Sequence, residues 1–171
     1  PTHLWSGSGG RLLRFPRPAS ISGPLRAQVA FEVDAAASFV ALDGNTLWTG
    51  DFYRSGDGDP RRRWAVAYTI DAATGHLRST ATRLAPDGRT VLAPDRAVRI
   101  PDRVQGLAMV GPYMALSRSY GPHTSTLELY ARPVDVAPGV VTDLPSQALR
   151  ILKLPAGSED LEAAGHRLAV V

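Results

Sequence analysis

The chain has 171 residues, a mass of 18.3 kDa, 44% apolar residues and a formal net charge of +3, from 19 basic and 16 acidic side chains. That length suits one sizeable core or a fraction of a larger repeat array. The weak charge does not indicate nucleic-acid binding, the lack of cysteine excludes disulfides and thiolate metal sites, and no apolar run reaches the roughly 18 residues of a spanning helix.

Short apolar stretches of β type follow one another along the chain. The 16 glycines and 14 prolines separate them so closely that long helices have little room. We predict strands at 11–15, 28–33, 38–42, 46–53, 64–70, 97–100, 106–110, 113–120, 126–134, 148–154 and 167–171. Turn signals between them, such as Asp-Gly at 43–44 and Gly-Pro at 111–112, are typical of hairpins. The segment 160–166 is the one helical candidate, but it is short, and the repeat described next predicts part of a hairpin there.

The repeat consists of three stretches that align without gaps: SFVALDGNTLWTG (38–50), QGLAMVGPYMALS (105–117) and EDLEAAGHRLAVV (159–171). Each has apolar residues at its third and tenth positions and a glycine at its seventh. This pattern predicts a hairpin in each copy, with a two-residue turn that begins at the glycine. HLWSG at 3–7 matches the second arm of a fourth copy, whose first arm we expect upstream of Pro1.

The spacing of the repeat indicates its architecture. Equivalent positions divide the chain into three approximate periods, 4–46, 47–113 and 114–167. Propeller blades have about 40–50 residues, and the stretches 54–63 and 71–96 look like insertions that lengthen the middle period. We therefore predict an all-β fold, a partial β-propeller of about three blades of antiparallel strands, in which residues 1–171 are one segment of a larger propeller. A β-sandwich is the alternative.

Three phrases carry a resemblance to known proteins: LDGNTLWTGDFYR (42–54), IPDRVQGLAMVGPYMALSRSYGPHTSTLELY (100–130) and LPAGSEDLEAAGHRLAVV (154–171). They resemble an uncharacterised group of exported bacterial β-propeller proteins, and the likeness spans most of residues 38–171. Asp51 stands where that group usually has glutamate. The resemblance implies a propeller fold and an extracytoplasmic location, but no established activity. More distantly, the blades are similar to those of gluconolactonase/regucalcin-like and NHL-type propellers.

Propellers bind ligands at the mouth of their central channel, so the polar residues next to the repeated strands are the candidate site. Asp51, Gln105 and Glu159 could form a ring of carboxylate and amide oxygens suited to Ca²⁺. The similarity to lactonase-type propellers implies that such a metal would polarise a carbonyl. The alternative, which we favour, is that these groups satisfy backbone amides where blades meet. The other channel-mouth candidates are Tyr53, Arg54, Ser117, Arg118, Ser119 and Tyr120.

Two further motifs have plain structural interpretations. SGDGDP at 55–60 has alternating aspartates but lacks the distal glutamate of an EF-hand, so we favour a surface loop. RRRW at 61–64 is too small a basic cluster to indicate nucleic-acid binding, and predicts a core Trp64 after a solvated loop end.

The inventory of chemical groups favours binding over catalysis. The sequence has no cysteine, no paired histidines and no nucleophile motif. We therefore expect a non-catalytic extracytoplasmic scaffold that binds an unknown protein or small-molecule ligand, with Ca²⁺ as the candidate ion. A metal-assisted hydrolase of the lactonase type, using Asp51 and Glu159, is the alternative.

Overall fold

A computed structural model describes residues 3–18, 23–53, 63–85, 87–119, 122–133, 140–158, 160–164 and 167–170. The described residues form strands and loops and contain no helix, so the predicted all-β class is confirmed. Within the same ranges, no helix is long and apolar enough to cross a membrane. The strands are β1 (His3–Ser8), β2 (Arg11–Pro16), β3 (Val29–Glu32), β4 (Phe39–Asp43), β5 (Thr46–Gly50), β6 (Trp64–Thr69), β7 (Thr82–Leu84), β8 (Thr90–Leu92), β9 (Arg96–Arg99), β10 (Val104–Val110), β11 (Tyr113–Arg118), β12 (Ser125–Ala131), β13 (Val141–Asp143), β14 (Arg150–Leu154), β15 (Leu161–Ala164) and β16 (Arg167–Val170).

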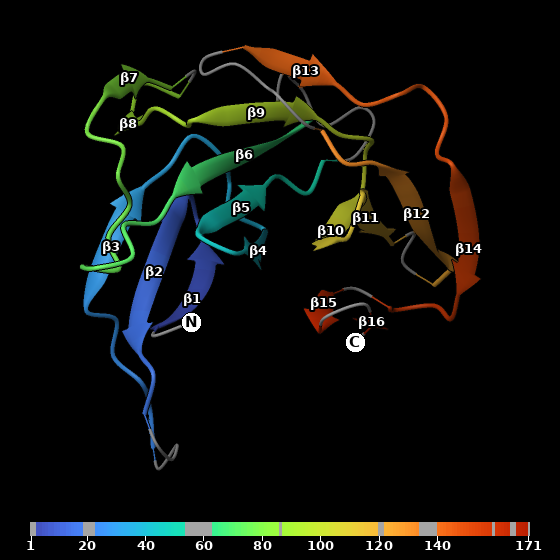
Figure 1. The fold of residues 1–171 in the computed structure, drawn as a ribbon, viewed down its shortest axis with the longest axis horizontal. Helices are drawn as coiled ribbons and strands as arrows, with labels where there is room; N and C mark the ends of the chain where they lie inside the picture. Colours follow the sequence, from blue (N-terminus) through green and yellow to red (C-terminus); the bar gives the residue numbers. More distant parts are fainter. Residues whose placement is uncertain are drawn as a thin grey trace.

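The strands form three larger sheets and two hairpins. The sheet orders are β1-β2-β3, β13-β9-β6-β5-β4 and β10-β11-β12-β14, and the two-stranded pairs are β7-β8 and β15-β16. In Figure 1 the three larger sheets follow one another in an arc, from β1–β3 through the five-stranded sheet to β10–β14, and the β15–β16 hairpin comes after them. Neighbouring strands pair in antiparallel fashion, apart from β13, which runs parallel to β9.

The predicted repeat of hairpins is confirmed. Asp43 lies opposite Thr46 in β4–β5, and Val110 lies opposite Tyr113 in β10–β11. The β15–β16 pair has the same register, and β15 lies within the helical candidate 160–166, which is therefore a strand over 161–164. The first arms lie together in space, because β10 packs beside both β4 and β15.

The order of strands after each hairpin also repeats. Next to the second arms β5 and β11 come β6 and β12, and next to these come β9 and β14. The sheet β1-β2-β3 follows the same order, beginning with the HLWSG phrase, which the alignment assigned to a second arm. The three larger sheets thus share one strand order. The five-stranded and four-stranded sheets begin with a first arm, β4 or β10, at one edge, and their later strands lie toward the other edge.

Apolar clusters fill the spaces between successive sheets. One cluster joins the five-stranded sheet to the four-stranded sheet and contains Trp48, Val98, Leu107 and Leu116. A second joins β1–β3 to the other face of the five-stranded sheet, through residues such as Leu12, Leu47 and Tyr68. A third, smaller cluster includes Ala115, Leu127 and Leu161 and connects the four-stranded sheet to β15. Apolar packing between their faces therefore holds successive sheets together.

Three of the described strands, β7, β8 and β13, were not predicted. The stretch 71–96, expected to be a polar insertion, contains the hairpin β7–β8, whose β8 lies beside β3. Strand β13 adds a fifth, parallel strand to the outer edge of the middle sheet, before the chain returns to form β14. The sheets therefore depart from a uniform set of four antiparallel strands. The predicted loop 55–60 lies outside the described residues.

Candidate functional site

The ends of the repeated strands meet around the segment 101–105. The backbone N–H of Arg103 donates to the Tyr53 carbonyl at 2.7 Å, and the N–H of Ser119 donates to the Arg103 carbonyl at 3.1 Å. Arg103 has a φ of 60°, a conformation that is uncommon for a residue with a side chain. The structure therefore brings the segments that follow β5 and β11 to the two sides of one short connection.

Arg118, one of the predicted channel-mouth residues, is the centre of a partly buried ionic network. Its Nε donates to the Asp102 carbonyl at 2.8 Å, and one Nη donates to Glu128 Oε1 at 2.6 Å, while the other contacts the Asp102 carboxylate. Tyr130 and Thr126 also donate hydroxyl hydrogen bonds to Glu128, which is 4% exposed. Arg118 is thus shared between two carboxylates and ties the segment before β10 to β11 and β12.

Asp51 lies at a different junction. It is buried at the end of β5, where its Oδ1 accepts a hydrogen bond from the backbone N–H of Ala36, in the connection between β3 and β4. This is the contact expected of a residue that satisfies a backbone amide between neighbouring sheets. Gln105 lies in the irregular register between Val104 and Gly106 of β10.

Three predicted site residues, Arg54, Tyr120 and Glu159, lie outside the described residues. The proposed ring of Asp51, Gln105 and Glu159 is therefore not placed as a whole. Among the described residues, no group of three or more His, Asp or Glu side chains is arranged to hold a metal ion.

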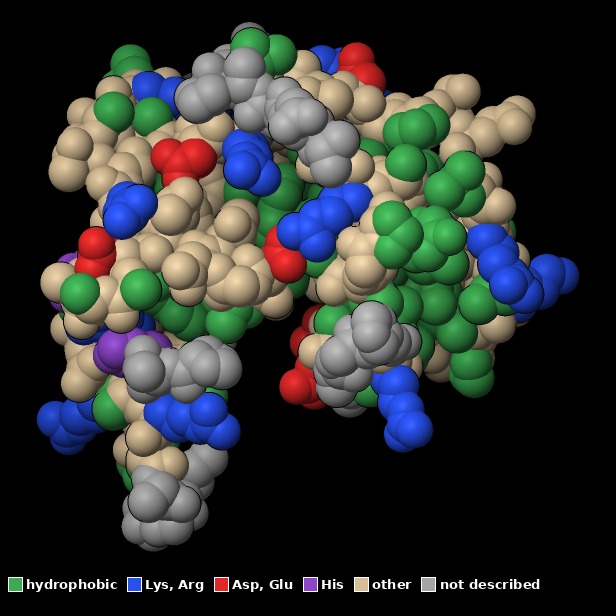
Figure 2. All heavy atoms as spheres, in the orientation of Figure 1, with side chains coloured by type: hydrophobic (Ala, Val, Ile, Leu, Met, Phe, Trp, Pro, Cys, Tyr) green, Lys and Arg blue, Asp and Glu red, His purple; other side chains and the backbone are tan. Residues whose placement is uncertain are grey.

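A groove follows the first arms of the hairpins. It has a volume of about 610 Å³ and is lined by residues of β4, β10 and β15, together with the Gly44-Asn45 turn. Apolar side chains such as Val40, Leu42 and Leu107 make up most of its lining, and Glu162 contributes a carboxylate. Figure 2 shows that the molecule is hollowed on this side, between β1–β3 and the β15–β16 hairpin.

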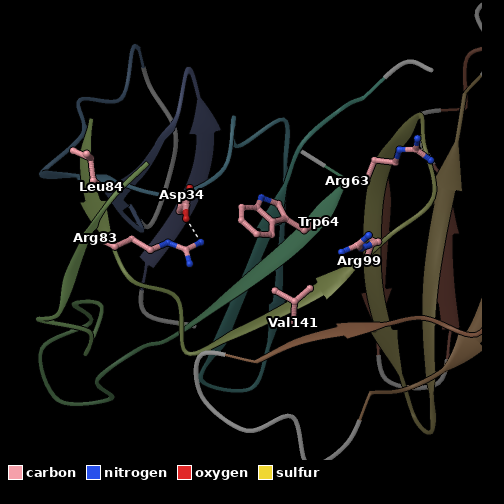
Figure 3. A pocket seen from close by; sticks show the side chains of 7 residues that line it. All are labelled: Asp34, Arg63, Trp64, Arg83, Leu84, Arg99 and Val141. Carbon is pink, nitrogen blue, oxygen red and sulfur yellow. Dashed lines mark ion pairs between the residues drawn. The ribbon is translucent and has the colours of Figure 1, made fainter. Parts of the chain in front are cut away.

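A second pocket, of about 360 Å³, lies between the five-stranded sheet and the β7–β8 hairpin (Figure 3). Trp64 lines it: this residue packs against the cluster between β1–β3 and the five-stranded sheet, in line with the predicted core position, but it is only partly buried. Arg63 is not part of a solvated loop end, because its guanidinium carbon lies 5.0 Å from the centre of the Tyr53 ring. Its neighbours in the pocket, Arg83 and Arg99, carried no sequence signal of a shared site.

Comparisons with known proteins do not assign this chain to a family: no protein-family model matches it, and no curated protein matches it. Function must therefore be inferred from the hollows of the molecule, of which the groove and the pocket around Trp64 are the larger two described above. The groove lies at the first-arm edge of the sheets, whereas the pocket around Trp64 lies toward the opposite edge, at β9 and β13.

Proposed function

We propose that the chain is a segment of a β-propeller from an exported bacterial protein and that it acts as a non-catalytic binding scaffold. The repeated strand order supports the propeller, because each blade of that fold is an antiparallel sheet that begins at its central axis. The neighbouring first arms β4, β10 and β15 support it further, since they occupy the place of innermost strands. A two-layer sandwich would instead pack one sheet against a single other sheet.

The groove along those first arms is the observation that carries the binding function. Its volume of about 610 Å³ lies within the usual range of ligand sites, which are mostly apolar with a few polar groups. Leu42 is 39% exposed beside it, and Asn45 and Glu162 offer polar atoms at its rim. The ligand that suits this lining is held by apolar contact and shape, with a few hydrogen bonds.

Binding is preferred to metal-assisted hydrolysis because of what Asp51 does. A metal ligand needs carboxylate oxygens that face the ion. Asp51 is 5% exposed and uses one oxygen to accept the Ala36 N–H, so this side chain already has a structural role. The resemblance to exported propellers without an established activity is consistent with a scaffold.

The test is a ligand-observed NMR screen of a library of neutral fragments against the chain and two matched variants. Leu42→Arg places a charge in the groove, whereas Leu149→Arg makes the same change at a site that is 63% exposed, next to the outer strand β14. We expect fragments that bind the wild type and Leu149→Arg but not Leu42→Arg. Fragments that bind all three proteins equally, or none at all, would contradict the groove as the site, and chemical turnover of a bound fragment would contradict the non-catalytic function.

A further inference from the structure

The pocket around Trp64 is a separate site, formed where three distant segments meet (Figure 3). Trp64 of β6 lies opposite Arg99 of β9 in the antiparallel register, so their side chains share one face of the sheet. Val141 of β13 pairs with Ala97, two residues before Arg99, and therefore belongs to the same face. Asp34, from the connection after β3, and Arg83, from β7, form the facing wall.

The charges in the pocket are unbalanced. Three arginines and one aspartate line it. Asp143 pairs with Arg99 beside the pocket, so these five side chains together carry one excess positive charge. Arg63 turns toward Tyr53, which leaves Arg83 and Arg99 as the cations on either side of the Trp64 ring in Figure 3. Two cations separated by an aromatic surface suit a ligand that has an anionic group at each end.

Arg83 is held firmly in this arrangement. It pairs with Asp34, which is 5% exposed, and its guanidinium carbon lies 5.2 Å from the centre of the Trp64 ring. Burial lowers the pKa of Arg83 from its ordinary value, because the guanidinium has lost part of its water. Since a guanidinium has five N–H donors, one carboxylate partner leaves it able to bind another.

Arg99 is the more accessible cation. Its Nε lies 3.0 Å from Asp143 Oδ1, and both side chains are largely exposed. An exposed pair of this kind is weak, so Arg99 can engage a second carboxylate at little cost. Between the two arginines, the partly buried Trp64 and the 40% exposed Val141 provide apolar surface.

We propose that this pocket binds a small organic dicarboxylate, with its apolar body on Trp64 and Val141 and one carboxylate toward each of Arg83 and Arg99. The volume of about 360 Å³ is that of a site for a small ligand, not for a protein chain. Neither the groove nor the propeller architecture enters this inference, so it stands or falls independently of the proposed function.

The experiment is isothermal titration calorimetry of the whole chain with octanedioate. Octanoate, which lacks one carboxylate, and inorganic sulfate, which lacks the apolar body, are the matched probes. We expect saturable binding of octanedioate and at least about tenfold weaker binding of both comparison ligands. Equal affinity for octanoate or for sulfate would overturn the proposal, and so would the absence of saturable octanedioate binding at millimolar concentrations.

Two variants locate the site. Arg99→Gln should weaken octanedioate binding by about tenfold, while Arg96→Gln, an exposed arginine of the same strand that points to the opposite face, should change it by less than about twofold. The double variant Asp34→Asn/Arg83→Gln removes the second cation without leaving a buried carboxylate unpaired, and should also weaken binding. Circular dichroism would confirm that each variant is folded. An equal loss in Arg96→Gln and Arg99→Gln would indicate general charge attraction and overturn the site.

Discussion

The packing of Trp5 and Trp48 explains why the phrase Leu-Trp-Ser/Thr-Gly occurs twice, at 4–7 and 47–50. Trp48 packs in the cluster between the five-stranded and four-stranded sheets, and Trp5 packs against the cluster between β1–β3 and the five-stranded sheet. Each tryptophan thus faces the sheet that follows. Gly50 is also required, because a Cβ there would lie 2.7 Å from the Trp64 carbonyl oxygen and would collide with the Phe39 ring. At Gly7 a Cβ would collide with the Ala37 carbonyl.

Asp51 provides a prediction about the calcium hypothesis. Asp51→Ala removes a hydrogen bond between the Ala36 N–H and a buried carboxylate, so we expect the free energy of unfolding to fall by about 1–3 kcal/mol. Asp143→Ala removes a carboxylate that is 71% exposed and should cost no more than about 1 kcal/mol. Urea unfolding with and without Ca²⁺ measures both.

The role of Asp51 as a backbone partner predicts that Ca²⁺ leaves the unfolding midpoint of the wild type unchanged. A rise in that midpoint with Ca²⁺, lost in Asp51→Ala and kept in Asp143→Ala, would show that Asp51 is a metal ligand. A structural role of Asp51 would then no longer count against metal-assisted hydrolysis.

At the scale of elements, the hairpins were predictable because their turns need glycine. Gly44 and Gly111 have φ values of 57° and 53°, which residues with a Cβ rarely adopt. Pro112 cannot take a positive φ, so its turn places that conformation on the first central residue alone, as in type II′. The glycine position therefore determined the register of two hairpins from local sequence.

Strands β7 and β13 were not predictable for a physical reason. Each has three residues, and β7 is exposed throughout, so neither shows the alternation of apolar and polar residues that marks a half-buried strand. The parallel pairing of β13 with β9 joins residues that are far apart in the sequence. Short strands of this kind are stabilised by hydrogen bonds to the strand beside them, and a local sequence pattern does not predict that pairing.

The connection before β10 provides a prediction at the same scale. Arg118 holds Asp102 and Glu128 together, and its own side chain is 17% exposed. Arg118→Ala leaves Glu128 buried without its cation, so we expect a loss of about 3–5 kcal/mol in the free energy of unfolding, measured with urea. Arg11→Ala is the control, because the Arg11–Glu32 pair is exposed and should contribute about 0–1 kcal/mol.

A second measurement distinguishes a local role from a general one. If Arg118 fixes the segment 101–105, Arg118→Ala should speed amide hydrogen exchange at Arg103 and Ser119, whose N–H groups donate across that segment. Exchange at those amides that stays as slow as in the wild type, with a small stability change, would contradict the proposed role of the network.

For the whole molecule, the sequence predicted the junction of strand ends around Arg103 better than it predicted the pocket around Trp64. The repeat predicted that residues after β5 and β11 come together, and the hydrogen bonds of Arg103 to both segments agree with it. The pocket of Trp64, Arg83 and Arg99 depends on a hairpin inside an apparent insertion and on a parallel strand. Such a site arises from long-range pairing, so a single sequence does not reveal it.

The arrangement of clusters also predicts how the chain unfolds. The middle sheet contributes Trp48 and Val98 to one cluster and Leu47 and Val66 to the other, so neither cluster can be lost without exposing a face of this sheet. We therefore expect the sheets to unfold together, in one transition. Two variants report on the two interfaces: Trp5→Phe/Trp64→Phe retains Trp48 as its fluorophore, and Trp48→Phe retains the other two tryptophans.

In each of these variants, urea unfolding followed by fluorescence and by far-ultraviolet circular dichroism should give coincident midpoints. Leu116→Ala, a fully buried residue of the cluster around Trp48, should lower both midpoints equally, with a loss of about 2–5 kcal/mol. If Leu116→Ala shifts the Trp48 transition while the Trp5 and Trp64 signals unfold at their original midpoint, the sheets are independent units. That result would contradict the coupling that we assign to the shared middle sheet.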